Sequence, residues 1–352
     1  MTFGNQPQFE HLAPLQLFWN HLEKPKGFLF IGDPHVSSVR PGKRNDDYTA
    51  SVLGKLSEAA RAATHLELIP VILGDLIHRE AENSIGMVSK LIRVLKEFPC
   101  TPLELGGNGH HGRHELDLVD EDIECLLQEA RVLHLLSDPN TRLDFEFSGQ
   151  RVRLHIAPYG AQIPIWLDKD AGVFNILLTH HDLGFDTAYP GAQPLVEIKG
   201  VDILVNGHMH KTSTSVKLGQ TVFHNPGNIE PLSIDCRDHR PAVWEWTPEL
   251  GQGLVPHYLT HNTNCFNLAG THVEAATSTA GVEALKESRF AALLGSREHS
   301  GQDAVRTDEA AFLGDDLDAV LASTKVSSAT ATLLRVLASE VAQEAINSAA
   351  SV

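Results

Sequence analysis

The sequence predicts an α/β protein built around a parallel sheet, and two observations support this. Short apolar segments recur along the chain, and each runs directly into a cluster of polar residues, as a buried strand does at the edge of a sheet. Between these segments, apolar residues recur at the spacing of amphipathic helices. Strands that alternate with helices form a parallel sheet, and enzymes of this class keep their chemistry at the carboxyl ends of the strands.

The first apolar segment lies within Phe28–His35 and ends in Gly-Asp-Pro-His. Further core strands are expected at Leu68–Leu73, Thr101–Leu105, Phe174–Thr179 and Asp202–Val205. Helices are expected at 46–64, 84–98 and 121–130. Hairpins across 143–156 and around the turn at Gly219-Gln220, with closing strands at 242–246 and 254–259, complete the expected core.

The composition is that of an ordinary globular chain, with 42% hydrophobic residues among 352. It contains no apolar run of the length that spans a membrane, and its first residues lack a secretory signal, so we expect a cytoplasmic protein with no membrane partner. The four cysteines are widely spaced, which indicates reduced residues. The net charge of −17 argues against non-specific coating of nucleic acid, but not against a local site that uses metal ions.

Five of the expected strands end in a residue type that binds metals. Taken alone, each such residue is as well explained by a helix cap or a solvated loop side chain. Five in one alternating pattern favour a shared site, because the carboxyl ends of parallel strands meet at one edge. The candidate ligands are Asp33, His35, Asp75, Asn108, His180, His208 and His210.

This set of side chains suits a centre with two divalent metal ions. Mixed imidazole, carboxylate and amide ligands favour transition metals over calcium. We expect manganese first, with iron, zinc and nickel as alternatives. Two such ions promote in-line displacement at phosphorus and generate hydroxide near neutral pH.

The motifs Asp-x-His, Gly-Asp, Gly-Asn, His and Gly-His-x-His, in this order over residues 26–235, resemble those of the calcineurin-like metallophosphoesterase superfamily. The resemblance implies a four-layer αββα sandwich with two facing sheets. It also implies that Asp33, His35 and His210 hold one metal, that Asn108, His180 and His208 hold the other, and that Asp75 bridges them. A closing turn of the family corresponds to residues 224–228.

Within that superfamily, Gly74-Asp75-Leu76-Ile77-His78 resembles the Gly-Asp-Leu-Phe-His of SbcD-type DNA repair nucleases and related phage-encoded phosphoesterases. The sequence departs from the Gly-Asp-x-x-Asp-Arg-Gly of protein phosphatases. The resemblance implies DNA as substrate and a position for His78 near that substrate. A polar residue flanking a helix is the alternative explanation of His78.

The third motif departs from the family pattern, because Gly109 follows Asn108 where a catalytic histidine is expected. Either the loop bulges and His110, or His111 after it, assists the leaving group, or the general acid is lost. Glycine favours the bulge, since it readily adopts positive φ. Loss of the acid would lower turnover by about 10²–10⁴-fold.

Outside the motifs, Arg40 and Arg44 follow the first strand and are candidates for contact with a substrate phosphate, with a solvated loop as the alternative. Residues 1–25 are expected to form a lead-in, 26–260 the catalytic core, 261–280 a linker and 281–352 a mainly helical extension. Residues 261–352 carry 12 acidic and 6 basic side chains, which favours docking to a protein over binding to nucleic acid. The sequence is also compatible with a homodimer.

Three functions are therefore considered. The first is an SbcD-like DNA nuclease, either exonuclease or endonuclease. The second is a phosphoesterase for small substrates such as nucleotides or cyclic nucleotides. The third is a metal-binding regulator that keeps the ligands but has lost the general acid, and its supporting feature is Gly109.

Overall fold

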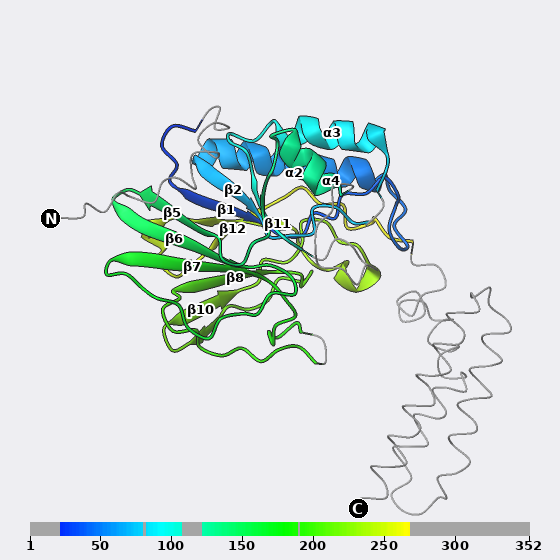
Figure 1. Ribbon diagram of the computed structural model, residues 1–352. Helices are drawn as coiled ribbons and strands as arrows, with labels where there is room; N and C mark the ends of the chain where they lie inside the picture. The colour runs from blue at the N-terminus through cyan, green and yellow to red at the C-terminus, as the bar shows by residue number, and fades with distance from the viewer. Residues whose placement is uncertain (1–21, 80–81, 108–121, 189–190, 268–352) are drawn as a thin grey trace, which may run out of the picture. The chain divides into compact units, whose positions relative to one another are not determined.

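The computed structural model describes residues 22–79, 82–107, 122–188 and 191–267, and it shows two six-stranded sheets facing each other (Figure 1). The first sheet has the order β12-β11-β1-β2-β3-β4. Its strands are β1 (Gly27–Ile31), β2 (Leu68–Ile72), β3 (Leu103–Leu105), β4 (His134–Leu136), β11 (Ala242–Trp246) and β12 (Val255–Tyr258). Strands β1 to β4 run parallel, and β11 lies antiparallel to β1 and to β12.

The second sheet has the order β5-β6-β7-β8-β10-β9. Its strands are β5 (Arg142–Phe147), β6 (Gln150–Ala157), β7 (Val173–His180), β8 (Ile203–Gly207), β9 (Val216–Leu218) and β10 (Thr221–His224). Strands β6, β7, β8 and β10 run parallel. The two expected hairpins are confirmed as β5–β6 and β9–β10.

The main core lies between the two sheets. On β1, Phe28 and Phe30 point into this layer, whereas Leu29 and Ile31 point to the opposite face. The ring of Phe28 meets that of Phe147 on β5 edge to face, with centroids 5.1 Å apart. Because β1 is buried on both faces, its sequence is an unbroken apolar run and not an alternating one.

Helices α2 (Tyr48–Leu66), α3 (Ile85–Leu95) and α4 (Ile123–Glu129) cover the outer face of the first sheet (Figure 1). Asp47 caps α2 by accepting from the N–H of Ala50, and Ser84 caps α3 by accepting from the N–H of Met87. These caps explain why both expected helices begin within two residues of the predicted position.

The outer face of the second sheet is covered differently. Leu183, Phe185 and Ile198, from the segments between β7 and β8, pack on Leu177 and Leu204 of the sheet. The α/β class with two facing sheets is confirmed, but this fourth layer is irregular in the described residues, where the family pattern implied helices.

The core extends further along the chain than the sequence predicted. Residues 261–267, assigned to the linker, pair with the loop after β1: the N–H of Asn45 donates to the carbonyl of Cys265 (2.9 Å), and the N–H of Asn267 donates to that of Lys43 (2.8 Å). The predicted lead-in up to residue 21 and the extension beyond 267 lie outside the described residues. None of the described helices has the length and apolar character needed to cross a membrane.

Candidate metal centre

Four strand ends, two from each sheet, bring their polar residues together. Asp33 and His35 follow β1, Asp75 follows β2, His180 ends β7, and His208 and His210 follow β8. The residue pairing of His180 with Gly207 keeps the ends of β7 and β8 level. Six of the seven predicted ligands therefore meet at one edge of the sandwich, and the seventh, Asn108, lies outside the described residues.

Asp75 lies between two groups of imidazoles. Its Oδ2 is 3.6 Å from Nε2 of His35 and 3.4 Å from Nε2 of His180. Nε2 of His35 is in turn 3.0 Å from Nε2 of His210. Two nitrogens bound at about 2.1 Å to one ion, at a right angle, lie about 3 Å apart, so this spacing fits two ligands of a single ion.

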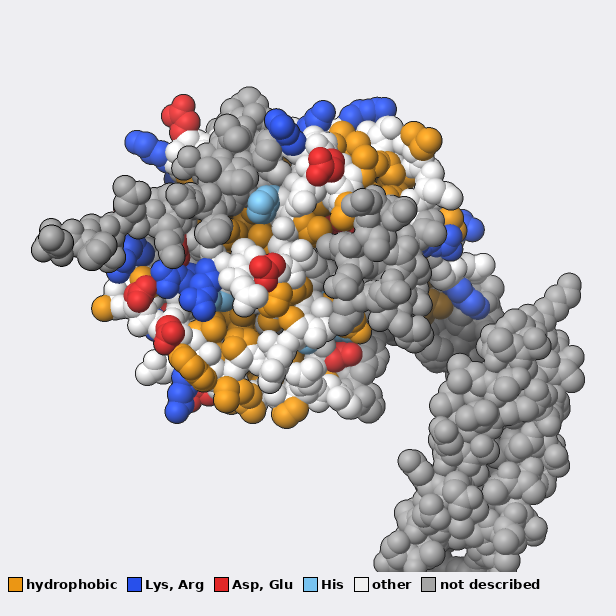
Figure 2. Space-filling model, viewed as in Figure 1, with side chains coloured by type: hydrophobic (Ala, Val, Ile, Leu, Met, Phe, Trp, Pro, Cys, Tyr) orange, Lys and Arg blue, Asp and Glu red, His pale blue; other side chains and the backbone are white. Residues whose placement is uncertain are grey.

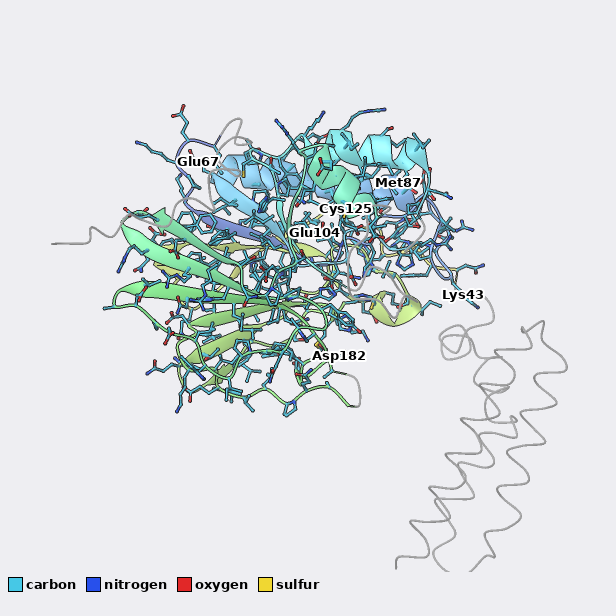
Figure 3. The ribbon with its side chains drawn as sticks, viewed as in Figure 1. Lys43, Glu67, Met87, Glu104, Cys125 and Asp182 are labelled. Carbon is cyan, nitrogen blue, oxygen red and sulfur yellow. The ribbon has the colours of Figure 1, made fainter. Side chains whose placement is uncertain are left out.

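On the other side of Asp75, one ligand atom from each of Asp75, His180 and His208 lies within 4.8 Å of the others. His180 is fully buried, and its Nδ1–H donates to the carbonyl of Leu73 (2.7 Å). That hydrogen bond fixes the tautomer and leaves Nε2 of His180 facing the site as a ligand atom. Nε2 of His208 also lies 3.3 Å from Oδ2 of Asp182, an exposed residue in the loop after β7 (Figure 3).

The backbone is strained at the same positions. Seven non-glycine residues have positive φ among those described, and four of them are Asp33 (23°), His35 (49°), Asp75 (48°) and His208 (71°). Such conformations cost energy and persist where the surrounding structure enforces them, commonly at functional sites. Four of the six described candidate ligands thus have this backbone conformation.

Glycine is required where the two sheets approach at this edge. A Cβ atom on Gly207 would overlap the carbonyl oxygen of Leu73 and lie 2.8 Å from Nδ1 of His180 and 2.9 Å from Oδ1 of Asp33. Any side chain at Gly207 would thus displace two ligands. The Gly-His and Gly-Asp pairs of the sequence reflect this packing.

Burial and charge set the protonation of the ligands. Burial raises the pKa of Asp33 to about 7, an effect that His180 opposes and Asp75 reinforces. Burial alone would lower the pKa of His180, but the charges of Asp75 and Asp33 outweigh it and raise that pKa to about 9. Burial and the charge of His180 lower the pKa of His208.

The residues present fit divalent metal ions. Asp33 is fully buried, and neither of its carboxylate oxygens has a hydrogen-bond partner of normal geometry among the described residues. Its charged neighbour is His180, whose Nδ1 lies 3.8 Å from Oδ1 of Asp33, and the carboxylate oxygens keep the capacity to bind a cation. With Asp75 and four imidazoles around it, the donor set matches transition-metal ions better than calcium.

A network of buried amides holds the loop of His208 and His210, and sequence reasoning did not find it. Asn206 on β8 accepts from the hydroxyl of Thr179 (2.7 Å) and donates to Asn225 (3.2 Å). Asn225 donates to the carbonyls of Met209 (3.0 Å) and Lys211 (2.7 Å), on either side of His210. The available signal was a polar Asn206 inside the apolar run of β8.

Glu104 on β3, labelled in Figure 3, lies close enough to Asp75 to feel its charge. Its Oε1 accepts from the N–H of Leu76 (3.2 Å), the residue that follows Asp75. Burial, with the nearby Glu124 and Asp75, raises the pKa of Glu104 well above its usual range. The hydrogen bond to Leu76 supports the turn after β2.

The predicted site residues other than the ligands and Arg44 divide into three groups. The ring of His78 lies 5.3 Å from that of His35, beside the centre. Arg40 is exposed, and its predicted phosphate contact stays a prediction. His110 and His111 lie outside the described residues.

The predicted contact of Arg44 with a substrate phosphate is wrong, because this side chain is buried and bonded to other residues. Its guanidinium donates to Glu230 and to Asp46 (2.5 Å) and also to the carbonyl of Pro231 (2.6 Å). Glu230 also accepts from Lys55 (2.7 Å) on α2. Arg44 ties the loop after β1 to helix α2 and the segment after β10, and it has no free donor face for a substrate phosphate.

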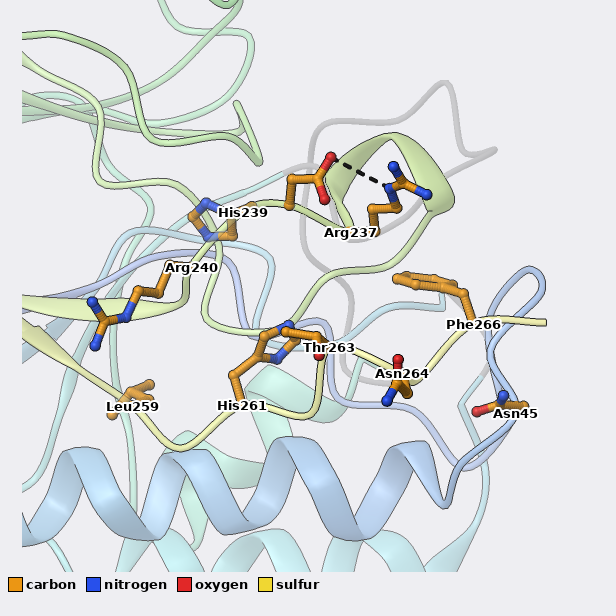
Figure 4. Close-up of a pocket in the computed structure, with 10 residues that line it drawn as sticks. Asn45, Arg237, His239, Arg240, Leu259, His261, Thr263, Asn264 and Phe266 are labelled. Atoms are coloured by element: carbon orange, nitrogen blue, oxygen red, sulfur yellow. Dashed lines mark hydrogen bonds and ion pairs between the residues drawn. The ribbon is translucent and has the colours of Figure 1, made fainter. Parts of the chain in front are cut away.

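A cavity of about 780 Å³ lies between the 237–240 segment and the 259–266 segment, and none of the predicted ligands lines it. Figure 4 shows His239, His261 and Phe266 around this cavity. Nε2–H of His239 donates to the carbonyl of Asn228 (2.7 Å), and Arg237 pairs with Asp238 (3.3 Å). His239 and Arg237 thus interact with other residues of this protein.

No family model and no curated protein matches the sequence. Similar solved structures include an archaeal phosphodiesterase, at 11% identity and a TM-score of 0.33, over 66% of this chain and 99% of that one. A hypothetical protein from Thermus thermophilus has 11% identity and a TM-score of 0.37, over 67% and 99%. A 5′-nucleotidase precursor from the same organism has 13% identity and a TM-score of 0.39, over 74% and 58%. These are distant similarities in fold.

Proposed function

We propose that this protein is a metal-dependent phosphoesterase that hydrolyses phosphodiester bonds with two divalent ions at the edge where the two sheets meet. The observation that carries the proposal is the meeting of two buried carboxylates, Asp33 and Asp75, with four imidazoles. Two divalent ions held by these residues would supply a nucleophilic water and neutralise the phosphoryl oxygens.

The chain's own residues contribute position and protonation state. Oδ2 of Asp75 lies 3.6 Å from Nε2 of His35 and 3.4 Å from Nε2 of His180, which suits a carboxylate shared by two ions. His35 and His210 form the pair on one side, and His180 and His208 the pair on the other. The hydrogen bond from His180 to Leu73 keeps its other nitrogen directed inward.

For the substrate, we propose a phosphodiester of nucleic acid, with manganese as the first candidate metal. The Gly74–His78 motif supports this choice, and so does the position of His78 beside His35. On the face in Figure 2, acidic and basic side chains of the described residues are interspersed, so binding of DNA would depend on the metals more than on a basic surface.

Hydrolysis of bis-p-nitrophenyl phosphate after chelation and addition of Mn²⁺ tests the phosphoesterase proposal. We expect turnover by the wild type and its loss in Asp75→Asn, which keeps the size of the side chain and removes the charge. Activity that is equal in both proteins would contradict the role of this centre. No turnover by either would favour a metal-binding regulator.

Parallel assays on single-stranded DNA, double-stranded DNA and cyclic nucleotides test the choice of substrate. We expect cleavage of DNA that is lost in Asp75→Asn. Hydrolysis of cyclic nucleotides with DNA left intact would reject the nuclease assignment and leave a phosphoesterase for small substrates.

A further inference from the structure

Tyr159, which follows β6 in the second sheet, lies at the rim of the metal centre. Its ring centroid is 5.6 Å from that of His208 and 6.2 Å from that of His180. These two histidines are the ligands on one side of Asp75. Tyr159 is 38% exposed, whereas His180 is fully buried. The ring of Tyr159 therefore lies beside these two histidines and also reaches solvent.

The backbone around Tyr159 is fixed to both sheets. The N–H of Tyr159 donates to the carbonyl of Gly106 after β3 (3.0 Å). The turn continues through an N–H from Ala161 to the carbonyl of Pro158 (3.0 Å), and the Nε2–H of His181 donates to the carbonyl of Ala161 (2.8 Å). This loop is held in place at three points, so the ring is presented in a defined position.

The ring of Tyr159 is not part of the hydrophobic core. Tyr159 belongs to none of the hydrophobic clusters of the described residues. A rigid, exposed aromatic ring beside a reaction centre can stack on a planar group of a ligand, and base–aromatic stacking accepts any nucleobase because each has a π-face.

We propose that Tyr159 is a specificity-determining residue that stacks on a nucleobase of the substrate and so selects nucleotide phosphodiesters over simple alkyl ones. The inference rests on the proposed phosphodiesterase function. It concerns the organic group of the substrate, whereas the metal ligands act on the phosphate.

Two p-nitrophenyl phosphodiesters test it, because they share the leaving group and the bond that breaks. One carries thymidine 5′-linked to phosphorus and the other carries a methyl group. With the manganese-loaded protein, we expect kcat/KM to favour the thymidine ester. Stacking of the usual strength corresponds to a preference of about 5- to 100-fold.

Tyr159→Ala is expected to reduce this preference by about tenfold, mainly through KM for the thymidine ester. Tyr159→Phe, which keeps the ring, should retain the preference. Trp166→Ala removes another exposed aromatic side chain outside the centre and is the matched control, with the preference unchanged.

An unchanged ratio of kcat/KM in Tyr159→Ala would overturn the inference while leaving the phosphodiesterase function intact. Loss of the preference in Tyr159→Phe would also overturn it, because the hydroxyl and not the ring would then be responsible. Absence of turnover of either ester by the wild type would refute the proposed function itself, and the inference with it.

Discussion

At the scale of single residues, Asp33 is held in an energetically unfavourable state at the candidate metal site. Its carboxyl is buried without a hydrogen-bond partner of normal geometry, and its backbone φ is positive. Its pKa is raised to about 7 from an ordinary value of 3.8. The folded metal-free protein therefore binds this proton more tightly than the unfolded chain does, and stability falls as pH rises through this range.

Asp33→Asn removes this cost, and asparagine tolerates the positive φ. We predict that the metal-free variant is more stable than the metal-free wild type at pH 8, by an amount on the order of 4 kcal/mol or less. The difference should fade toward pH 4, where the carboxyl is protonated in the folded state and about half protonated in the unfolded chain. Urea unfolding in the presence of a chelator measures it. Equal stability at pH 8 would show that Asp33 carries no such cost.

The affinity for metal should depend on pH through His180 and Asp33. In the metal-free protein these groups have pKa values of about 9 and about 7, and a metal ion must displace their protons. We predict that the affinity for Mn²⁺ rises about tenfold per pH unit between pH 7 and 9, and more steeply below pH 7. Calorimetric titration at several pH values tests this, and a flat profile would contradict it.

At the scale of elements, the close approach of strand ends is the feature that a substitution should break. Gly207→Ala would place a methyl group against the carbonyl of Leu73 and beside His180 and Asp33. We predict a loss of metal affinity of about 10- to 100-fold, because metal sites are sensitive to shifts in the groups that orient their ligands.

Gly54→Ala is the matched control, because nothing lies within 4 Å of a Cβ at that position in α2. It should leave metal binding unchanged and stabilise the helix by about 1 kcal/mol. Normal metal affinity in Gly207→Ala would contradict the packing described for this edge.

The buried ion cluster around Glu230 joins three elements, and Arg44 is its link to the loop after β1. Arg44→Ala leaves Glu230 with one cation fewer in a buried position, which costs about 3–5 kcal/mol of stability. Exposed Arg40→Ala should change stability by less than about 0.5 kcal/mol. Thermal and urea unfolding compare the two. A fully stable Arg44→Ala would show that this buried ion cluster does not depend on Arg44.

These elements also show what the sequence can and cannot predict. Strand ends can be predicted from the sequence because a buried parallel strand is apolar and ends at polar residues. This pattern predicts Asp33, Asp75 and His180 together. Arg44 was misassigned because a basic loop residue has the same local signature whether it faces solvent or a buried Glu230 far along the chain. β4 was missed because it is short and, unlike β3 of the same length, no glycine-containing polar motif follows it in the sequence.

At the scale of the whole molecule, the pairing of the two sheets could not be predicted from periodicity. It depends on contacts between residues far apart in the chain, such as Phe28 with Phe147. The same holds for Tyr159, whose importance comes from two histidines on β7 and after β8. The two-sheet arrangement was predicted only from the resemblance in motifs. The irregular layer over the second sheet was found only in the structure.

The most direct test of the dinuclear centre is the number of metal ions that the protein binds. The purified chain is stripped with a chelator, dialysed against Mn²⁺ and analysed for metal content per chain, with Asp75→Asn treated in parallel. We predict two ions per chain for the wild type and fewer for Asp75→Asn, because the carboxylate between the two imidazole pairs is lost. A wild type that binds fewer than two ions, or no more than Asp75→Asn binds, would contradict the dinuclear centre.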